Sequence, residues 1–111
     1  MKRGDVVLVA IQGDFGKVRP AIVVQADQSS FVDSVTVCLV TSELVDGMFV
    51  RVDVQPTVSN GLAKVSKIQA DKVQTVRKTR IRERLGALSA VEMSLLDSAL
   101  ALHLDLYAPQ R

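Results

Sequence analysis

The sequence predicts a small, mainly β domain, an antiparallel barrel or sandwich that ends in one α-helix. Short apolar runs rich in valine and isoleucine recur through the first two thirds of the chain, and turn-forming residues separate them. From residue 88 onward the apolar residues change to helical spacing. With 111 residues, 48% of them hydrophobic, the chain is long enough to close one core and is expected to form a single domain over 1–111.

Four strands are predicted in the first half of the chain. The first covers 6–10, and the second covers 20–26 because proline is best tolerated at the first residue of a strand. Residues 35–41 are rich in β-branched side chains and form the third. Within 48–54 every second residue from position 50 is a valine, which is typical of a half-buried strand.

Turn signals and a basic stretch follow. Asp46-Gly47 and the segment 56–61, which ends in Asn60-Gly61, are predicted turns. A fifth strand is expected over 63–69. Beyond it the basic residues up to position 84 indicate a turn or short helix and then another short strand.

The C-terminal helix is the most clearly marked element. Ser89 and Glu92 have the spacing of a capping box, with Leu88 and Met93 placed as the hydrophobic staple around it. The apolar stripe contains Met93, Leu96, Leu100, Leu104 and Tyr107, and it is widened by Leu95, Ala99, Leu102 and Leu106. An arc this wide predicts a helix that packs on the sheet and also supports a partner subunit. His103 lies inside the arc and is expected to be a hydrogen-bonded core residue rather than a catalytic base.

Composition excludes several chemistries. No run approaches the roughly 20 apolar residues of a membrane span, and the first residues turn polar too soon for a signal peptide. The single Cys38 sits in an apolar run and is expected to be a core residue of a cytoplasmic protein. One cysteine and one histidine cannot build a usual zinc site, and no phosphate-binding glycine fingerprint is present. No metal or cofactor is expected.

The charge is strongly segregated. Residues 64–84 hold eight basic and two acidic side chains, whereas the net charge of the whole chain is +2. The rest of the chain is therefore acidic overall. Such a segment predicts a site for a polyanion, either a nucleic acid or an acidic protein tail. A solvated face of a strand and turn is the alternative.

Four further residues are candidates for phosphate chemistry. Arg19 lies between a glycine-containing loop and the second strand, so a rigid strand would hold its planar set of donors at the root of the loop. Thr41 and Ser42 place hydroxyls at the end of the third strand, and Asp71 borders the basic stretch. The alternative is a surface charge for Arg19, a turn at the strand end for Thr41 and Ser42, and a turn or salt bridge for Asp71.

The order of these pieces resembles the MazF/PemK family of toxin endoribonucleases. The resemblance is carried by RGDVVLV, GKVRPAIVV, VTVCLVTSEL, KIQADKVQTVRKTRI and GALSAVEMSLLDSALALHLDL, which span nearly the whole chain. It implies an SH3-like antiparallel β-barrel with a C-terminal α-helix, of the Kid/MazF/CcdB-like type, and a homodimer. It also implies metal-independent, sequence-preferring cleavage of single-stranded RNA by a toxin (an mRNA interferase) that inhibits translation and growth. The expected ends are a 5′-hydroxyl and a 2′,3′-cyclic phosphate or 3′-phosphate.

The resemblance assigns roles to residues. Arg19 takes the place of the arginine that stabilises the scissile phosphate, and Thr41 that of the hydroxyl residue beside it. In the PemK/Kid branch an acidic residue at the position of Asp71 acts as the base. That branch has an arginine where this chain has Gln69, and a histidine in the first loop that this chain lacks. The expected RNA contacts are Phe15, Lys17, Ser42, Gln69, Lys72, Arg77, Lys78 and Arg80.

Partners follow from the same resemblance. A cognate antitoxin with an acidic C-terminal tail is expected to lie across the toxin dimer, on the surface that RNA would use. Two rival functions share the fold or the charge. One is a CcdB-like gyrase poison, and the other is a non-catalytic barrel that binds nucleic acid.

Overall fold

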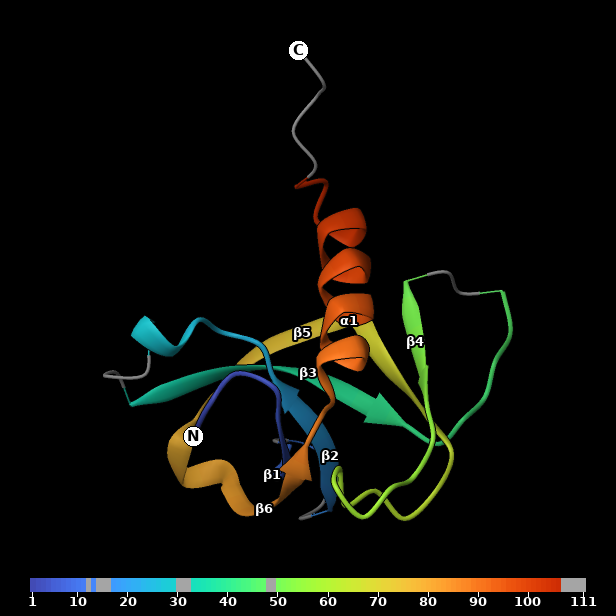
Figure 1. Ribbon diagram of the computed structural model, residues 1–111. Helices are drawn as coiled ribbons and strands as arrows, with labels where there is room; N and C mark the ends of the chain where they lie inside the picture. The colour runs from blue at the N-terminus through green and yellow to red at the C-terminus, as the bar shows by residue number, and fades with distance from the viewer. Residues whose placement is uncertain (12, 14–16, 30–32, 48–49, 107–111) are drawn as a thin grey trace.

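In the part of the chain that the structure describes, six strands form one antiparallel sheet and one α-helix packs against it (Figure 1). This computed structural model describes all residues except 12, 14–16, 30–32, 48–49 and 107–111. The strand order is β4-β5-β3-β2-β1-β6. The elements are β1 (Asp5–Ala10), β2 (Val18–Val23), η1 (Asp27–Ser29), β3 (Ser34–Thr41), β4 (Arg51–Val54), β5 (Ser66–Arg77), η2 (Lys78–Arg80), β6 (Ile81–Ala87) and α1 (Ala90–His103). The mainly β fold with a C-terminal helix is thus confirmed.

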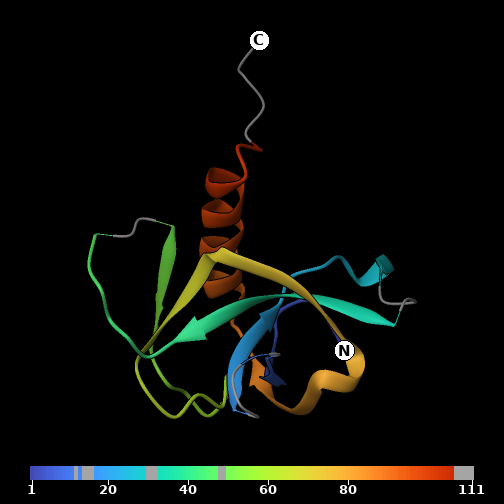
Figure 2. The ribbon, with the colours of Figure 1, turned by 180° about the vertical axis from the view of Figure 1, so that it is seen from behind.

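The sheet curls strongly. β1 and β5 are separated in the sheet by two other strands, yet Ala10 and Ile11 at the end of β1 line one hollow with residues 74–77 of β5. Figure 2 shows β5 sweeping across the back of the molecule towards η2. This curvature brings the basic far end of β5 next to the start of the β1–β2 connection.

Both faces of the central strands are buried. Alternate residues point to opposite faces of a strand, and Val6, Ile22 and Cys38 accordingly join a cluster that includes Leu96 and Leu100 of α1. Their neighbours in sequence form a second cluster on the other face, made of Val7, Val9, Ala21, Val23, Val35, Val37 and Leu39. The two clusters fix β1, β2 and β3 as the rigid centre of the protein.

All five predicted strands differ from their predicted bounds, β2 and β5 the most, and β2 ends at Val23 rather than at residue 26. β2 begins at Val18 and not at Pro20, because Ala10 of β1 continues the pairing to Val18. β2 pairs with β3 only from Ala21 onward. At Pro20 the β3 side of β2 therefore has no ladder hydrogen bonds, and the missing N–H of proline is tolerated there. β5 starts later than expected and runs on to Arg77, since β3 offers it a partner as far as Ser34.

The helix begins as predicted. Ser89 Oγ accepts a hydrogen bond from the Glu92 N–H at 3.1 Å, and Glu92 Oε1 accepts one from the Ser89 N–H at 2.9 Å. The expectation for His103 is wrong, because this residue is exposed. The last turns of α1 project away from the sheet (Figure 1), so that side chains there have no core to enter. Exposed apolar residues of this part of the chain are Leu95, Leu102, Leu104 and Leu106.

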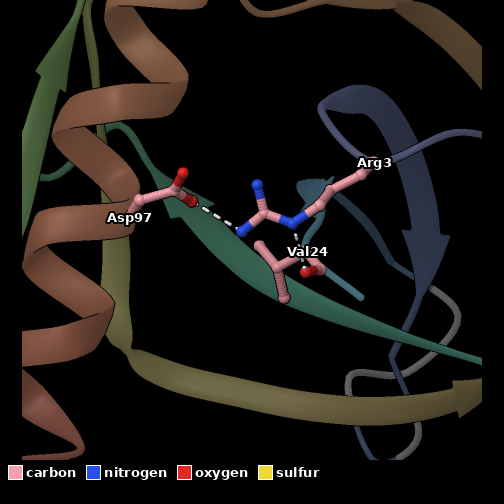
Figure 3. A network of polar contacts seen from close by, with 3 residues as sticks. All are labelled: Arg3, Val24 and Asp97. Carbon is pink, nitrogen blue, oxygen red and sulfur yellow. Dashed lines mark hydrogen bonds and ion pairs between the residues drawn. The ribbon is translucent and has the colours of Figure 1, made fainter. Parts of the chain in front are cut away.

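Arg3 joins three separate segments (Figure 3). Its guanidinium donates to the Val24 carbonyl at 2.8 Å and to Asp97 Oδ1 of α1 at 2.6 Å. Its main-chain N–H donates to Asp27 Oδ1 at 2.8 Å. These bonds hold the helix against the connection that follows β2. No helix within the described residues is long and apolar enough to cross a membrane.

The turn after β4 crosses directly over β6. Asn60 is fully buried, and its Oδ1 accepts from the main-chain N–H groups of Thr57 and Leu62, both at 3.0 Å. Gly61 has φ +70°, and a Cβ there would lie 2.2 Å from the Leu85 carbonyl oxygen. Only glycine therefore allows this approach, which sets the path of the chain towards residue 64.

We expect Gly61→Ala to lower the free energy of unfolding by about 2–4 kcal/mol, the sum of left-handed strain and overpacking. Gly47→Ala is the matched control, because Gly47 also has positive φ (+87°) but has open space around its Cα. The control should lose only about 1–2 kcal/mol. Urea unfolding of both variants is the measurement. Equal losses would show that the contact with β6 is unimportant.

Candidate active site

A pocket of about 340 Å³ lies where β2 begins and β3 ends. Ala21 of β2 pairs with Leu39 of β3, so Arg19 lies two residues before the first of these paired residues and Thr41 two residues after the second. Both side chains line the pocket. The polar lining of the pocket consists of Arg19, Thr41, Ser42, Glu43, Lys64 and Ser66. The structure thus brings together the three residues predicted at the ends of these strands.

The hydroxyl of Thr41 is oriented by the chain that follows it. Its Oγ1 accepts a hydrogen bond from the main-chain N–H of Glu43 at 3.1 Å. Because the oxygen is occupied as an acceptor from this side, the hydroxyl hydrogen can be donated into the pocket. A bound oxyanion is the natural acceptor for it.

Charge and apolar surface meet in this pocket. Arg19 and Lys64 are exposed cations in the pocket lining, and Glu43 adds one carboxylate. Pro20, Val40 and Leu62 supply apolar lining. Guanidinium and ammonium groups around a small cavity favour a phosphate, and the apolar lining can receive the ribose or base attached to it.

Lys64 and Leu62 enter the pocket on the turn that Asn60 fixes. Asn60 Nδ2 also donates to the Gln55 carbonyl at 2.8 Å, so the whole turn is held from inside. Sequence reasoning marked Asn60-Gly61 as a turn but missed its role, and it passed over Glu43. The signal that could have identified Glu43 is its position directly after the predicted Thr41-Ser42 pair.

Asp71 lies elsewhere. It does not line the pocket, and it follows Lys67, the pairing partner of Thr41, by four residues or about 13 Å of strand. Arg51 of β4 donates to both carboxylate oxygens, with both distances 3.1 Å. The hydrogen bonds from Arg51 hold the pKa of Asp71 below its ordinary value. A carboxylate engaged in this way is a weak proton acceptor.

The other predicted RNA contacts are spread along the molecule. Lys17 and Lys72 are exposed, whereas Gln69 is buried, with 9% of its surface accessible. Arg77 and Arg80 line the hollow beside Ile11, and Lys78 lies next to it. Phe15 is outside the described residues. Of the basic segment only Lys64 lines the Arg19 pocket, since the other cations lie on β5, η2 and β6.

The remaining candidates for metal or thiol chemistry offer little. No group of three or more potential metal-ligating histidine, cysteine, aspartate or glutamate side chains occurs among the described residues. Cys38 is fully buried, and burial raises the pKa of its thiol to about 12. A thiol with so high a pKa is not a nucleophile at neutral pH.

One family model and two known proteins are similar to this chain over nearly its whole length. The model of a family described as PemK-like, MazF-like toxin of type II toxin–antitoxin system matches residues 2–104. A probable endoribonuclease MazF of Mycolicibacterium smegmatis is 36% identical over 107 residues, covering 96% of this chain and 98% of that protein. Endoribonuclease MazF9 of Mycobacterium tuberculosis is 30% identical over 118 residues, covering 97% and 99%.

Two solved structures have the same fold as this chain. A mycobacterial endoribonuclease in complex with its cognate antitoxin superposes with a TM-score of 0.83, covering 98% of this chain and 99% of that one at 22% identity. A MazE–MazF structure from Deinococcus radiodurans gives a TM-score of 0.74 at 24% identity and covers 94% of each chain.

We expect Asp71→Asn to lower the free energy of unfolding at pH 7 by about 1–3 kcal/mol, because it weakens charged hydrogen bonds to a mostly buried Arg51. The depressed pKa belongs to the folded state. The pair therefore stabilises the fold above the ordinary carboxyl pKa, near 4, and this stabilisation is lost as the pH falls through the folded value. The difference between variant and wild type should accordingly shrink below about pH 4.

Urea unfolding between pH 3 and 7 measures this difference. Asp53→Asn is the matched control, because Asp53 is paired with Lys67 but has 75% of its side chain exposed. An exposed pair contributes little. A loss in Asp71→Asn that does not depend on pH would contradict the ion-pair explanation.

Proposed function

The chain belongs to the PemK-like, MazF-like toxin family of type II toxin–antitoxin systems, and from that premise we propose that its β2–β3 pocket cleaves single-stranded RNA without a metal ion. The observation that carries the proposal is the presence of Arg19 and Thr41 in one pocket. The relatives named above are endoribonucleases. The chain is accordingly an endoribonuclease toxin, and the pocket is our assignment of its site.

The chemistry requires few protein groups, because RNA carries its own nucleophile. The 2′-oxygen attacks the adjacent phosphorus, a bond from phosphorus to that oxygen forms, and the bond to the 5′-oxygen breaks. Negative charge grows on the non-bridging oxygens during this step. Arg19 binds these oxygens, Thr41 donates its hydroxyl hydrogen to one of them, and Lys64 adds positive charge. The products are a 2′,3′-cyclic phosphate and a 5′-hydroxyl.

RNA on either side of the cleaved bond is proposed to follow the exposed cations. Ser42 lines the pocket, and the exposed Lys17 directly precedes Val18, which also lines it. The curl of the sheet brings a further basic group to the root of the β1–β2 connection, and it consists of Arg77, Lys78 and Arg80. Phosphate contacts of this kind position RNA without reading its sequence.

A homodimer and an antitoxin complete the proposal. The exposed leucines of α1 supply apolar surface that a second copy would cover. An antitoxin accompanies the similar mycobacterial endoribonuclease in its solved structure. For this chain we propose that an acidic, initially disordered tail binds the cations around the Arg19 pocket and thereby excludes RNA.

Arg19→Ala and Thr41→Ala should each lower the cleavage rate by about 10²–10³-fold, because each removes a donor to the developing charge. Long RNAs incubated with EDTA provide the assay, and gel electrophoresis with end analysis gives the rate and the termini. Lys2→Ala and Ser94→Ala are matched controls, since these exposed residues line neither the pocket nor the basic hollow. Wild-type rates in both pocket variants would contradict the site assignment. Inhibition of gyrase with all RNAs intact would favour the rival function.

We expect an acidic antitoxin-tail peptide and RNA to compete for the Arg19 pocket. The assay titrates a labelled RNA, with a 2′-deoxy nucleotide at the cleavage site, off the wild-type protein with the peptide. RNA binding should weaken more steeply with salt than peptide binding, because RNA releases condensed counterions. Peptide binding that leaves the RNA fully bound would place inhibition away from this pocket.

A further inference from the structure

The proposed reaction leaves one proton without an acceptor. The attacking 2′-hydroxyl must lose its proton as its oxygen bonds to phosphorus. An arginine guanidinium keeps its protons at physiological pH, and a protonated lysine has no lone pair to offer. Arg19 and Lys64 therefore cannot take this proton in their charged forms. The acceptor must therefore be a neutral or anionic group at the pocket.

Among the described residues that line the pocket, Glu43 is the one carboxylate. It lies two residues after Thr41 on the chain that leaves β3, and it is exposed. A carboxylate open to water can accept a proton and then return it to solvent, as a general base must in each cycle.

The other candidates are placed less well. Both oxygens of Asp71 accept from Arg51, and Asp71 does not line the pocket. His103 is at the end of α1 and is likewise no part of the pocket lining. Sequence reasoning favoured Asp71, but the structure offers a nearer carboxylate.

One contact restricts where Glu43 can be. Its main-chain N–H donates to Thr41 Oγ1 at 3.1 Å, so the backbone of Glu43 and the hydroxyl of Thr41 are held as one unit. The hydrogen bonds to Asp71 chiefly raise the pKa of the Arg51 guanidinium, and the negative charge of Glu43 adds to this. Glu43 thus lines the Arg19 pocket with its backbone tied to Thr41.

We propose that Glu43 is the general base that accepts the proton of the attacking 2′-hydroxyl. The inference rests on the proposed function. The proton passes from the 2′-oxygen to the Glu43 carboxylate as the new oxygen–phosphorus bond forms. The leaving 5′-oxygen takes a proton from water, and Glu43 returns its own proton to solvent. Thr41 and Glu43 would then work on the same nucleotide, one on the phosphate and the other on the sugar.

The test compares wild type with Glu43→Gln in single-turnover cleavage of one RNA between pH 3 and 9, a range that spans the ordinary carboxyl pKa of about 4. Glu43→Gln should be about 10²–10⁴-fold slower at pH 7. In the wild type the rate should fall on the acid side, where a carboxylate base becomes protonated, and this break should be absent from the variant. Glu43→Asp should recover part of the rate.

Controls separate catalysis from binding and folding. The dissociation constant for the RNA with a 2′-deoxy nucleotide at the cleavage site should stay within threefold of the wild-type value in Glu43→Gln. Glu83→Gln, on β6 and outside the pocket, should cleave at the wild-type rate. Far-ultraviolet circular dichroism and urea unfolding check that Glu43→Gln is folded.

The outcomes are distinguishable. Glu43→Gln that cleaves within threefold of an active wild type, or that keeps the acid break, overturns the assignment of Glu43 alone. Weakened RNA binding that accounts for the whole loss of rate also overturns it. A wild-type protein that leaves every RNA intact overturns the proposed function, and this inference with it.

Discussion

The antiparallel ladder between β2 and β3 is the constraint on which the site depends. Ala21, Ile22 and Val23 pair with Leu39, Cys38 and Val37, and their side chains enter two cores on opposite faces. A slip of one residue would reverse every one of these side chains, at a cost of several buried apolar groups. The register is therefore fixed by packing, and it fixes in turn where the two strands place their polar ends.

Sequence reasoning succeeded where local chemistry decides the structure. The Ser89–Glu92 capping box needs only neighbours in sequence, and the valine pattern of β4 reports its two faces directly. The order of motifs identified the family and drew attention to Arg19 and Thr41. Sequence reasoning failed where residues far apart in the sequence decide the structure. β5 extends to Arg77 because β3 lies beside it, and no alternation within β5 announces this.

The same limit applies to single side chains. His103 fits the apolar arc of α1 in sequence but stands beyond the sheet in space. Asp71 looks like a base in the linear motif until Arg51, twenty residues earlier, is seen to hold both its oxygens. The net charge of residues 64–84 was evident from composition. The separation of Lys64 from Arg77 and Arg80 was not, because it follows from the length of β5, and the prediction ended this strand at residue 69.

The pairing of β1 with β6 has a consequence for biosynthesis. β1 is made early, but one of its two neighbours in the sheet is made only after residue 81, and the helix that covers one core comes later still. A nascent chain that ends within β5 thus has every predicted catalytic side chain but lacks the edge and the cover that stabilise them. Contacts between such distant segments fold slowly. The ladder between β1 and β6 and the cover over the core therefore form only when synthesis is nearly complete.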